Sequence, residues 1–132
     1  MVSSPKSPAH DAIAATIDRY QRTFSDGDRE GWLALWADDG VLEDPVGSPP
    51  RTGRDGLAAF WDEIHDQPSH GTVAMTQGPA VCGFEAAWAF ALRVPAGERT
   101  VTVEIIDHGT FTADGRIRSV RAFWSETGVR SG

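Results

Sequence analysis

One carboxyl stands out because of the strand face on which the sequence places it. Residues 98–112 alternate apolar and polar side chains, a pattern that predicts a long β-strand. The alternation puts Val103, Ile105 and Asp107 on one face and His108 on the other. A bulge after Asp107 would leave this assignment intact. Asp107 is therefore predicted to point toward the apolar interior.

A carboxyl among valines and isoleucines has two physical options. It can pair with a cation, and Arg118 and Arg121 on the next predicted strand are the candidates. It can also stay protonated, because burial disfavours the anion; neutrality at pH 7 requires a pKa rise of about three units, or about 4 kcal/mol. The sequence leaves both options open. In the neutral form Asp107 would be a hydrogen-bond donor.

Tyr20 is a second candidate donor, and it is the only tyrosine in the chain. Ile13, Ile17, Tyr20 and Phe24 follow one another at steps of four, three and four, which predicts the apolar stripe of a helix. Tyr20 is thus expected on a buried face, either as an ordinary core tyrosine with a backbone partner or as a donor to a ligand.

Three helices are predicted in the N-terminal half of the chain. Ser7-Pro8 opens the first, and Asp28 caps a second that ends before Gly40. The third begins with a capping-box-like signal at Thr52 and ends near Pro68. The apolar stripes of the second and third helices are Trp32, Leu33 and Trp36, and Leu57, Phe60, Trp61 and Ile64.

Strands are predicted to follow the helices. Residues 41–44 form a short strand closed by Pro45, and from residue 72 onward the pattern has period two, with strands near 72–78, 85–94, 98–112 and 116–126. Helices followed by an antiparallel meander indicate an α+β fold. We expect one domain over residues 1–132, with both ends, 1–8 and 128–132, frayed.

Composition excludes several classes of partner. With 12 Lys+Arg against 19 Asp+Glu, the net charge is −7, which is unfavourable for nucleic acid and for anionic membranes. No apolar run is long enough to span a bilayer, and the N-terminus has no signal-peptide pattern. The single Cys82 cannot form an internal disulfide, so we expect a reducing, cytoplasmic location. The four histidines lack metal-ligand spacing, so no metal is expected.

Several segments together resemble ketosteroid isomerase (steroid Δ-isomerase), over residues 10–126. They are Ile17-Asp18-Arg19-Tyr20, Leu35-Trp36-Ala37-Asp38-Asp39, Glu43-Asp44-Pro45-Val46-Gly47-Ser48, Ile106-Asp107-His108 and Arg121-Ala122-Phe123-Trp124. The resemblance implies three helices on a strongly curved antiparallel sheet, a cone of the nuclear-transport-factor-2-like type, and a homodimer.

The resemblance also implies roles for three residues. Asp44 matches the family's general base, Tyr20 its oxyanion-hole tyrosine, and Asp107 its protonated oxyanion-hole acid. This family is an established example of a buried aspartic acid kept neutral at neutral pH. The implied reaction converts a 3-oxo-Δ5-steroid to the Δ4 isomer by moving a proton through a dienolate, without a cofactor. Asp44 is expected at the cavity rim, wet enough to stay anionic.

The expected substrate is small, apolar and steroid-like, so the cavity walls should be apolar. The candidate wall residues, from matching and alternation, are Phe60, Phe90, Leu92, Val103, Ala122 and Trp124. Trp36 and Trp61 stand where some members carry further tyrosines, so an extended tyrosine network is absent. Gly109 replaces a frequent aromatic residue and is expected to make the pocket floor roomier.

Two other functions remain open. A fold does not dictate an activity, so the chain could be a non-catalytic member that carries an apolar ligand or serves as a dimerisation module. It could also be a related polyketide cyclase or epoxide hydrolase, which would use the same cone with other polar residues. The set of Asp44, Tyr20 and Asp107 favours the isomerase.

Overall fold

The computed structural model describes residues 9–67 and 70–132. In these ranges the helices are α1 (His10–Asp26), α2 (Arg29–Leu33) and α3 (Gly53–His65), with a 3₁₀ turn, η1 (Glu126–Gly128). The strands are β1 (Trp36–Glu43), β2 (Arg51–Thr52), β3 (Thr72–Cys82), β4 (Glu85–Ala96), β5 (Arg99–Phe111), β6 (Ile117–Phe123) and β7 (Val129–Ser131). The predicted helix start at Ser7-Pro8 and the predicted fraying of residues 1–8 lie outside the described residues. The third helix ends at His65, close to the end predicted near Gln67-Pro68.

All seven strands belong to one sheet with the order β2-β1-β6-β5-β4-β3, and β7 pairs with β5 beyond the end of β6. The predicted meander of β3 to β6 and the α+β class are confirmed. The prediction of an antiparallel sheet is wrong for one pair of strands, because β1 runs parallel to β6, with Leu42 opposite Val120. Pairing between such distant segments leaves no trace in the local period of either strand.

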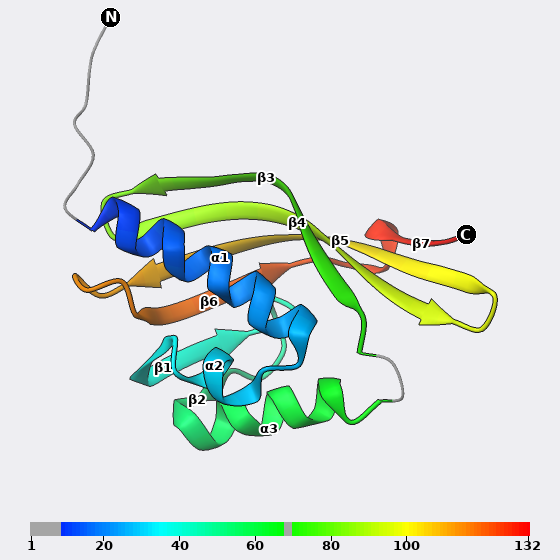
Figure 1. Cartoon of the computed structure of the whole chain (residues 1–132), viewed down its shortest axis with the longest axis horizontal. Helices are drawn as coiled ribbons and strands as arrows, with labels where there is room; N and C mark the ends of the chain where they lie inside the picture. Colours follow the sequence, from blue (N-terminus) through cyan, green and yellow to red (C-terminus); the bar gives the residue numbers. More distant parts are fainter. Residues whose placement is uncertain (1–8, 68–69) are drawn as a thin grey trace, which may run out of the picture.

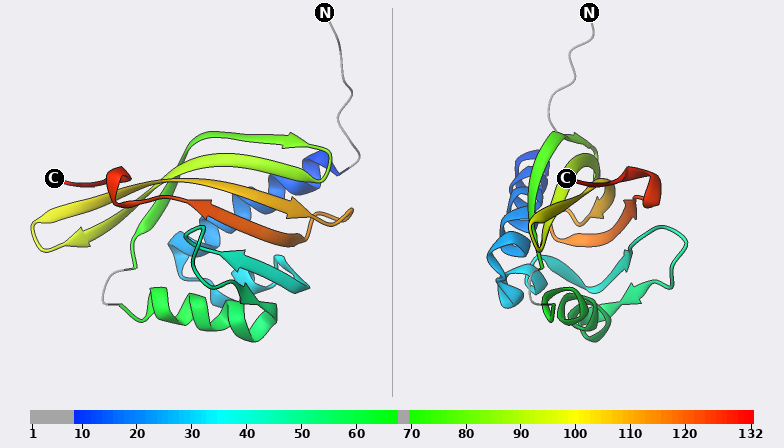
Figure 2. Two further views of the ribbon diagram at one scale, coloured as in Figure 1. Left: turned by 180° about the vertical axis from the view of Figure 1, so that it is seen from behind. Right: turned by 90° about the vertical axis from the view of Figure 1, so that its right-hand side faces the viewer.

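The helices cover one side of the curved sheet. Figure 1 shows α1 lying across the sheet beside β3, and α3 at the far end beside β1 and β2. Figure 2 shows how strongly the strands curve around the side on which the helices lie. The core includes Ile13 and Ile17 of α1, together with Trp32, Leu42 and Phe111. Among the described helices, none is long and apolar enough to cross a membrane.

The second helix is shorter than predicted. Gly27, at a φ of 71°, ends α1, and the Asp28 side chain accepts a hydrogen bond from the Gly31 amide, as expected of a cap. However, α2 ends at Leu33, and Trp36 begins β1 instead of continuing the helix. Trp36 pairs with Ile117 of β6. Long-range strand pairing therefore outweighs the helical spacing of the tryptophans.

The start of α3 and the C-terminus also differ in detail from the prediction. Thr52 precedes α3, as predicted, but its side chain makes no capping hydrogen bond. Residues 129–131 are paired as β7 instead of frayed, because β5 extends past the end of β6 and offers Val101 to Val103 as an open edge. The sixth strand correspondingly ends at Phe123, before Trp124.

Candidate active site

An apolar cavity of about 180 Å³ lies between the curved sheet and the helices. Five of the six candidate wall residues line it, namely Phe60, Phe90, Leu92, Val103 and Trp124. Ala122 is the exception, because it is buried in the core of β6 and does not line the cavity. The lining residues that were not named as wall residues are Gln21, Phe24, Trp32, Ile64, Val73 and Ile105. Helical or strand spacing marks most of these six as buried, but it cannot distinguish a cavity wall from solid core.

Asp107 lies at the centre of this sheet, with Trp88 of β4 on one side and Ala122 of β6 on the other. The irregularity in the β5–β6 pairing falls between Thr110 and Phe111, after Asp107, so the side-chain alternation at Asp107 is preserved. Asp107 is only 2% exposed and points to the interior, where it lines the cavity. The inward carboxyl expected from the sequence is present.

Asp107 has no cationic partner among the described residues. Arg121 instead donates a 2.8 Å hydrogen bond to Glu43, and Arg118 is exposed. Oδ1 of Asp107 is buried, and no described residue bonds to it. Burial and the nearby charge of Asp44 raise the pKa of Asp107 well above 3.8. The salt-bridge option is therefore wrong, and the structure favours the protonated acid.

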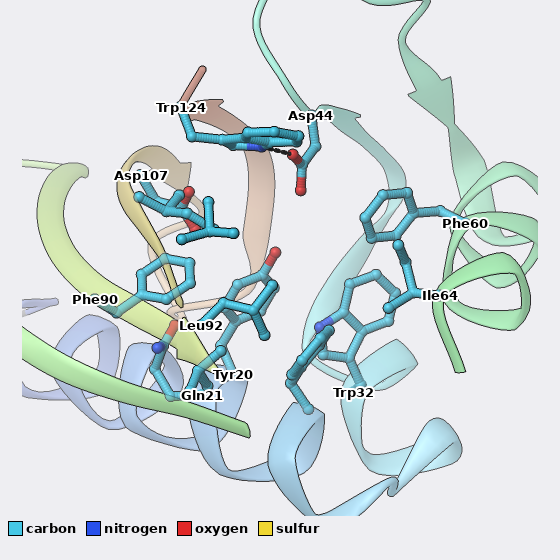
Figure 3. A pocket seen from close by; sticks show the side chains of 14 residues that line it. Tyr20, Gln21, Trp32, Asp44, Phe60, Ile64, Phe90, Leu92, Asp107 and Trp124 are labelled. Atoms are coloured by element: carbon cyan, nitrogen blue, oxygen red, sulfur yellow. Dashed lines mark hydrogen bonds between the residues drawn. The ribbon is translucent and has the colours of Figure 1, made fainter. Parts of the chain in front are cut away.

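Asp44 follows the last residue of β1 and reaches the same cavity. The loop after it is held against β6, because the amide of Val46 donates to the carbonyl of Ala122 at 2.9 Å. Trp124 donates from Nε1 to Oδ1 of Asp44 at 2.7 Å, as Figure 3 shows. Burial raises the pKa of Asp44 above 3.8, whereas this hydrogen bond lowers it. Asp44 is thus less exposed to water than expected. The hydrogen bond from Trp124 offsets part of the pKa rise that burial causes.

The hydroxyl of Tyr20 points into the space that the two carboxyls face (Figure 3). Burial raises the pKa of Tyr20 well above 10.0, and the charges of Asp107 and Asp44 raise it further. All three groups line the same cavity, so a charge on one of them acts on the others at short range. The chain brings them together from α1, the end of β1 and the middle of β5.

Tryptophan rings, not further hydroxyls, surround Tyr20. Its ring stacks on Trp32 at a centroid distance of 5.8 Å and meets Trp36 edge-on at 6.1 Å. Trp61 packs instead against Trp32 and His65. No hydrogen bond from the described residues reaches the Tyr20 hydroxyl. The phenolic proton is therefore available to a ligand, and no relay extends behind it.

Gly109 does not enlarge the cavity, contrary to expectation. A Cβ atom at this position would lie 3.1 Å from the Phe111 ring and 3.3 Å from Trp88. Neither ring lines the cavity, so the space left by the missing side chain is filled by core packing. Trp88 in turn donates from Nε1 to Oε1 of Gln21 at 3.1 Å. Gly109 thus leaves room for the rings of Phe111 and Trp88, which pack against the β5 backbone at this position.

The histidines take no part in this site. His108 bonds to Glu85 at 2.8 Å on the outer face of the sheet. His65 lies between the carbonyl oxygens of Trp61 and Phe24, where burial lowers its pKa below 6.5. Within residues 9–67 and 70–132, no group of three or more His, Cys, Asp or Glu side chains is arranged to hold a metal ion.

Comparison with known proteins identifies the family. Residues 17–120 match the model of the SnoaL-like domain. The chain belongs to this family. This SnoaL-like chain is 35% identical over 113 residues to a steroid Δ-isomerase of Nocardioides simplex, an alignment that covers 86% of the chain and 89% of the relative. The fold, with three helices on a curved sheet, is the one that the resemblance to ketosteroid isomerase implies.

The SnoaL-like chain is also similar to enzymes with a different chemistry. It is 32% identical over 127 residues to the epoxide hydrolase LasB of Streptomyces lasalocidi. This alignment covers 91% of this chain but only 44% of LasB. The solved structure of the epoxide hydrolase/cyclase-like enzyme SalBIII superposes with a TM-score of 0.82 over 93% of this chain and 98% of the other, at 22% identity. The SalBIII likeness shows the fold alone. The SnoaL-like chain is thus related both to an isomerase and to epoxide-processing enzymes.

Proposed function

We propose that this protein is a steroid Δ-isomerase that converts 3-oxo-Δ5-steroids to 3-oxo-Δ4-steroids. The observation that carries the proposal is the pair of carboxyls in one apolar cavity. Asp44 is held by the indole of Trp124, a donor that stabilises its anion. Asp107 is buried without a cation, which favours its neutral acid. A base and an acid are thereby available in the same site at the same pH.

In this mechanism Asp44 removes a proton from C4 of the steroid. The electron pair moves toward the ketone, and negative charge develops on the C3 oxygen as a dienolate. The protonated Asp44 then returns the proton to C6, which gives the conjugated enone. Atoms and charge balance within the substrate and one carboxyl, so the reaction needs no cofactor. A base placed in this way accelerates proton transfer by roughly 10²–10⁴-fold.

Tyr20 and Asp107 would stabilise the dienolate by donating hydrogen bonds to the C3 oxygen. No described residue bonds to Oδ1 of Asp107 or to the Tyr20 hydroxyl. The Tyr20 ring is held by stacking on Trp32, and Asp107 is held between β4 and β6. Donors that are fixed before the charge develops need no rearrangement during the reaction, and each contributes roughly 10²–10³-fold. A neutral acid next to an apolar wall strengthens this effect, because water does not compete there.

The wall of the cavity suits a fused-ring hydrocarbon. Phe60, Phe90, Leu92 and Val103 surround the three polar groups, and Trp124 adds a flat face beside Asp44. Burial of such a ligand would be driven mainly by the hydrophobic effect. Orientation would come from the ketone, because its oxygen is the natural acceptor for Tyr20 and Asp107.

A direct assay tests the proposal. The purified protein is mixed with a 3-oxo-Δ5-steroid, and the ultraviolet absorbance of the conjugated enone is followed. We expect acceleration over buffer that is lost in Asp44→Asn and retained in Asp39→Asn, a variant at an exposed aspartate outside the cavity. Absence of acceleration in the unmodified protein would exclude the isomerase.

Epoxide opening is the second candidate, and the similarity to LasB favours it. A neutral Asp107 or Tyr20 would protonate the epoxide oxygen as the C–O bond breaks. Ionised Asp44 would take the proton of the attacking nucleophile, which is water for a diol product and the substrate's own hydroxyl for a cyclic ether. The same two protonation states thus serve both reactions. Incubation with a hydroxylated polycyclic epoxide distinguishes epoxide opening from isomerisation. If the protein opens the epoxide, mass spectrometry would show a diol with the mass of one added water, or a cyclic ether of unchanged mass. Turnover of the epoxide without enone formation would favour this alternative.

The homodimer remains a prediction, and the outer face of the sheet offers a surface for it. Ile106 and Phe123 lie opposite each other on β5 and β6 and are 55% and 43% exposed. The ion pairs Arg121–Glu43 and Arg130–Glu104 provide charges of both signs on the same two strands and their neighbours. A face with both signs can complement itself across a two-fold axis. Sedimentation of the unmodified chain and of Phe123→Lys tests this expectation.

A further inference from the structure

The C-terminal strand β7 continues the line of β6 along β5 after an interruption. Phe123 of β6 lies opposite Ile106, and Val129 of β7 lies opposite Val103. Five residues, 124–128, therefore face only two residues of β5. The three residues in excess leave the ladder and form η1. The two strands act as fixed points on either side of a short loop.

Trp124 is the first residue of this interruption. It follows the last residue of β6, and its indole crosses to Asp44 at the end of β1. Its side chain is 37% exposed, so burial alone does not hold it. The conformation of the loop therefore depends on where the chain returns to the sheet, which is set by β7.

Several contacts attach β7 to β5. The backbone of Gly132 exchanges two hydrogen bonds with Thr100, at 3.0 and 3.1 Å. Arg130 lies opposite Thr102 and pairs with Glu104 at 3.3 Å. The loop itself is closed by the Gly128 amide, which donates to the Ser125 carbonyl at 2.9 Å. The attachment point is next to the cavity, because Val103, the partner of Val129, lines its wall.

We propose that β7 is a positioning element for the site: by fixing the return of residues 124–128 to β5, it holds the Trp124 indole against the Asp44 carboxylate. Its catalytic consequence rests on the proposed function, whereas its geometric part does not. A strand that only covered the open edge of β5 would leave the Trp124–Asp44 bond unchanged when removed. A positioning strand would not.

Two variants remove the pairing in different ways. Deletion of residues 129–132 removes β7. Arg130→Pro keeps the length but removes the amide hydrogen at the position opposite Thr102, which belongs to the same hydrogen-bonded set as the Gly132–Thr100 pair. Arg130→Ala is the matched control, because it loses the ion pair with Glu104 but keeps the backbone donor. Circular dichroism checks that each variant is folded.

The first measurement needs no substrate. Nuclear magnetic resonance follows the carboxyl carbon of Asp44 through a pH titration and the indole N–H signal of Trp124. Because the hydrogen bond from Trp124 lowers the pKa of Asp44, its loss should raise that pKa, and the indole signal should move toward that of a free tryptophan. We expect both changes in the deletion and in Arg130→Pro, and neither in Arg130→Ala. Folded β7 variants with an unchanged titration and indole signal would overturn the proposal.

The second measurement connects the strand to catalysis. At neutral pH the deletion should lower kcat/KM for enone formation by about fivefold and move the acidic limb of its pH profile to higher pH. Trp124→Phe should do the same, and the combined variant should also lose about fivefold instead of 25-fold, because both changes remove one interaction. Multiplicative losses would overturn the proposal. If the protein had no isomerase activity, the proposed function would fail, and the titration would still decide the role of β7.

Discussion

Asp44 and Asp107 share one cavity, and the negative charge of Asp44 helps to raise the pKa of Asp107 well above 3.8. The two carboxyls differ in their surroundings. Asp44 accepts a hydrogen bond from Trp124, whereas Asp107 is enclosed by β-strands, with its buried oxygen unpartnered among the described residues. Like charges in a shared site favour one ionised and one neutral group. The proposed division into base and acid therefore follows from the surroundings of the two side chains.

Replacement of the base should separate catalysis from binding. We expect Asp44→Asn to lower kcat by roughly 10²–10⁴-fold, because the amide cannot accept the C4 proton. A phenolic steroid should still bind, since Tyr20 and Asp107 remain. Enone formation and fluorescence titration with the phenolic ligand measure the two effects. Near-normal turnover would mean that the base is elsewhere.

Tyr20→Phe is an unusually clean substitution, because the chain has no other tyrosine. It should lower kcat by roughly 10²–10³-fold through loss of one donor to the dienolate. In the unmodified protein, the phenolate absorbance should appear only above pH 10, because burial raises the pKa of Tyr20, and the charges of Asp44 and of Asp107, once it is ionised, raise it further. Phenolate that forms at or below pH 10 in the folded protein would contradict the buried surroundings described for Tyr20.

Asp107 should make stability depend on pH. The folded protein holds the Asp107 proton above pH 3.8, where the unfolded chain releases it, so stability contributed by this group is lost as pH rises toward its folded pKa. Asp107→Asn, which resembles the neutral acid, should melt at a higher temperature than the unmodified protein at pH 7, because it has no proton to release on unfolding. The difference should vanish near pH 3. Asp39→Asn, at an exposed site, is the control and should show no such pattern.

Gly109→Ala should destabilise the fold by about 1–3 kcal/mol, since a methyl group there would press on Phe111 and Trp88. Gly128→Ala is the matched control, because its Cβ would meet only the Glu104 carbonyl at an ordinary 3.4 Å. Urea unfolding gives both free energies. Equal stability of the two variants would mean that the Phe111 and Trp88 rings can move aside at little cost.

Local spacing accounts for what the sequence alone determined. The alternation around Asp107 correctly predicted an inward carboxyl, and the helical steps through Ile13 and Ile17 predicted the helix face that carries Tyr20. Both depend on short-range periodicity, which the backbone imposes on every helix and strand. The same periodicity predicted the order of helices and meander.

Long-range pairing decided the rest. Trp36 has helical spacing to Trp32, yet it joins a strand because Ile117 lies opposite it. Asp107 does not pair with Arg121, because Arg121 lies on the opposite face of the sheet and donates a hydrogen bond to Glu43. The bond from Trp124 to Asp44 spans 80 positions and joins residues that follow the ends of β6 and β1, which the parallel pairing of these strands brings together. Such contacts depend on segments that meet only in the folded chain, so the tertiary structure alone decides them.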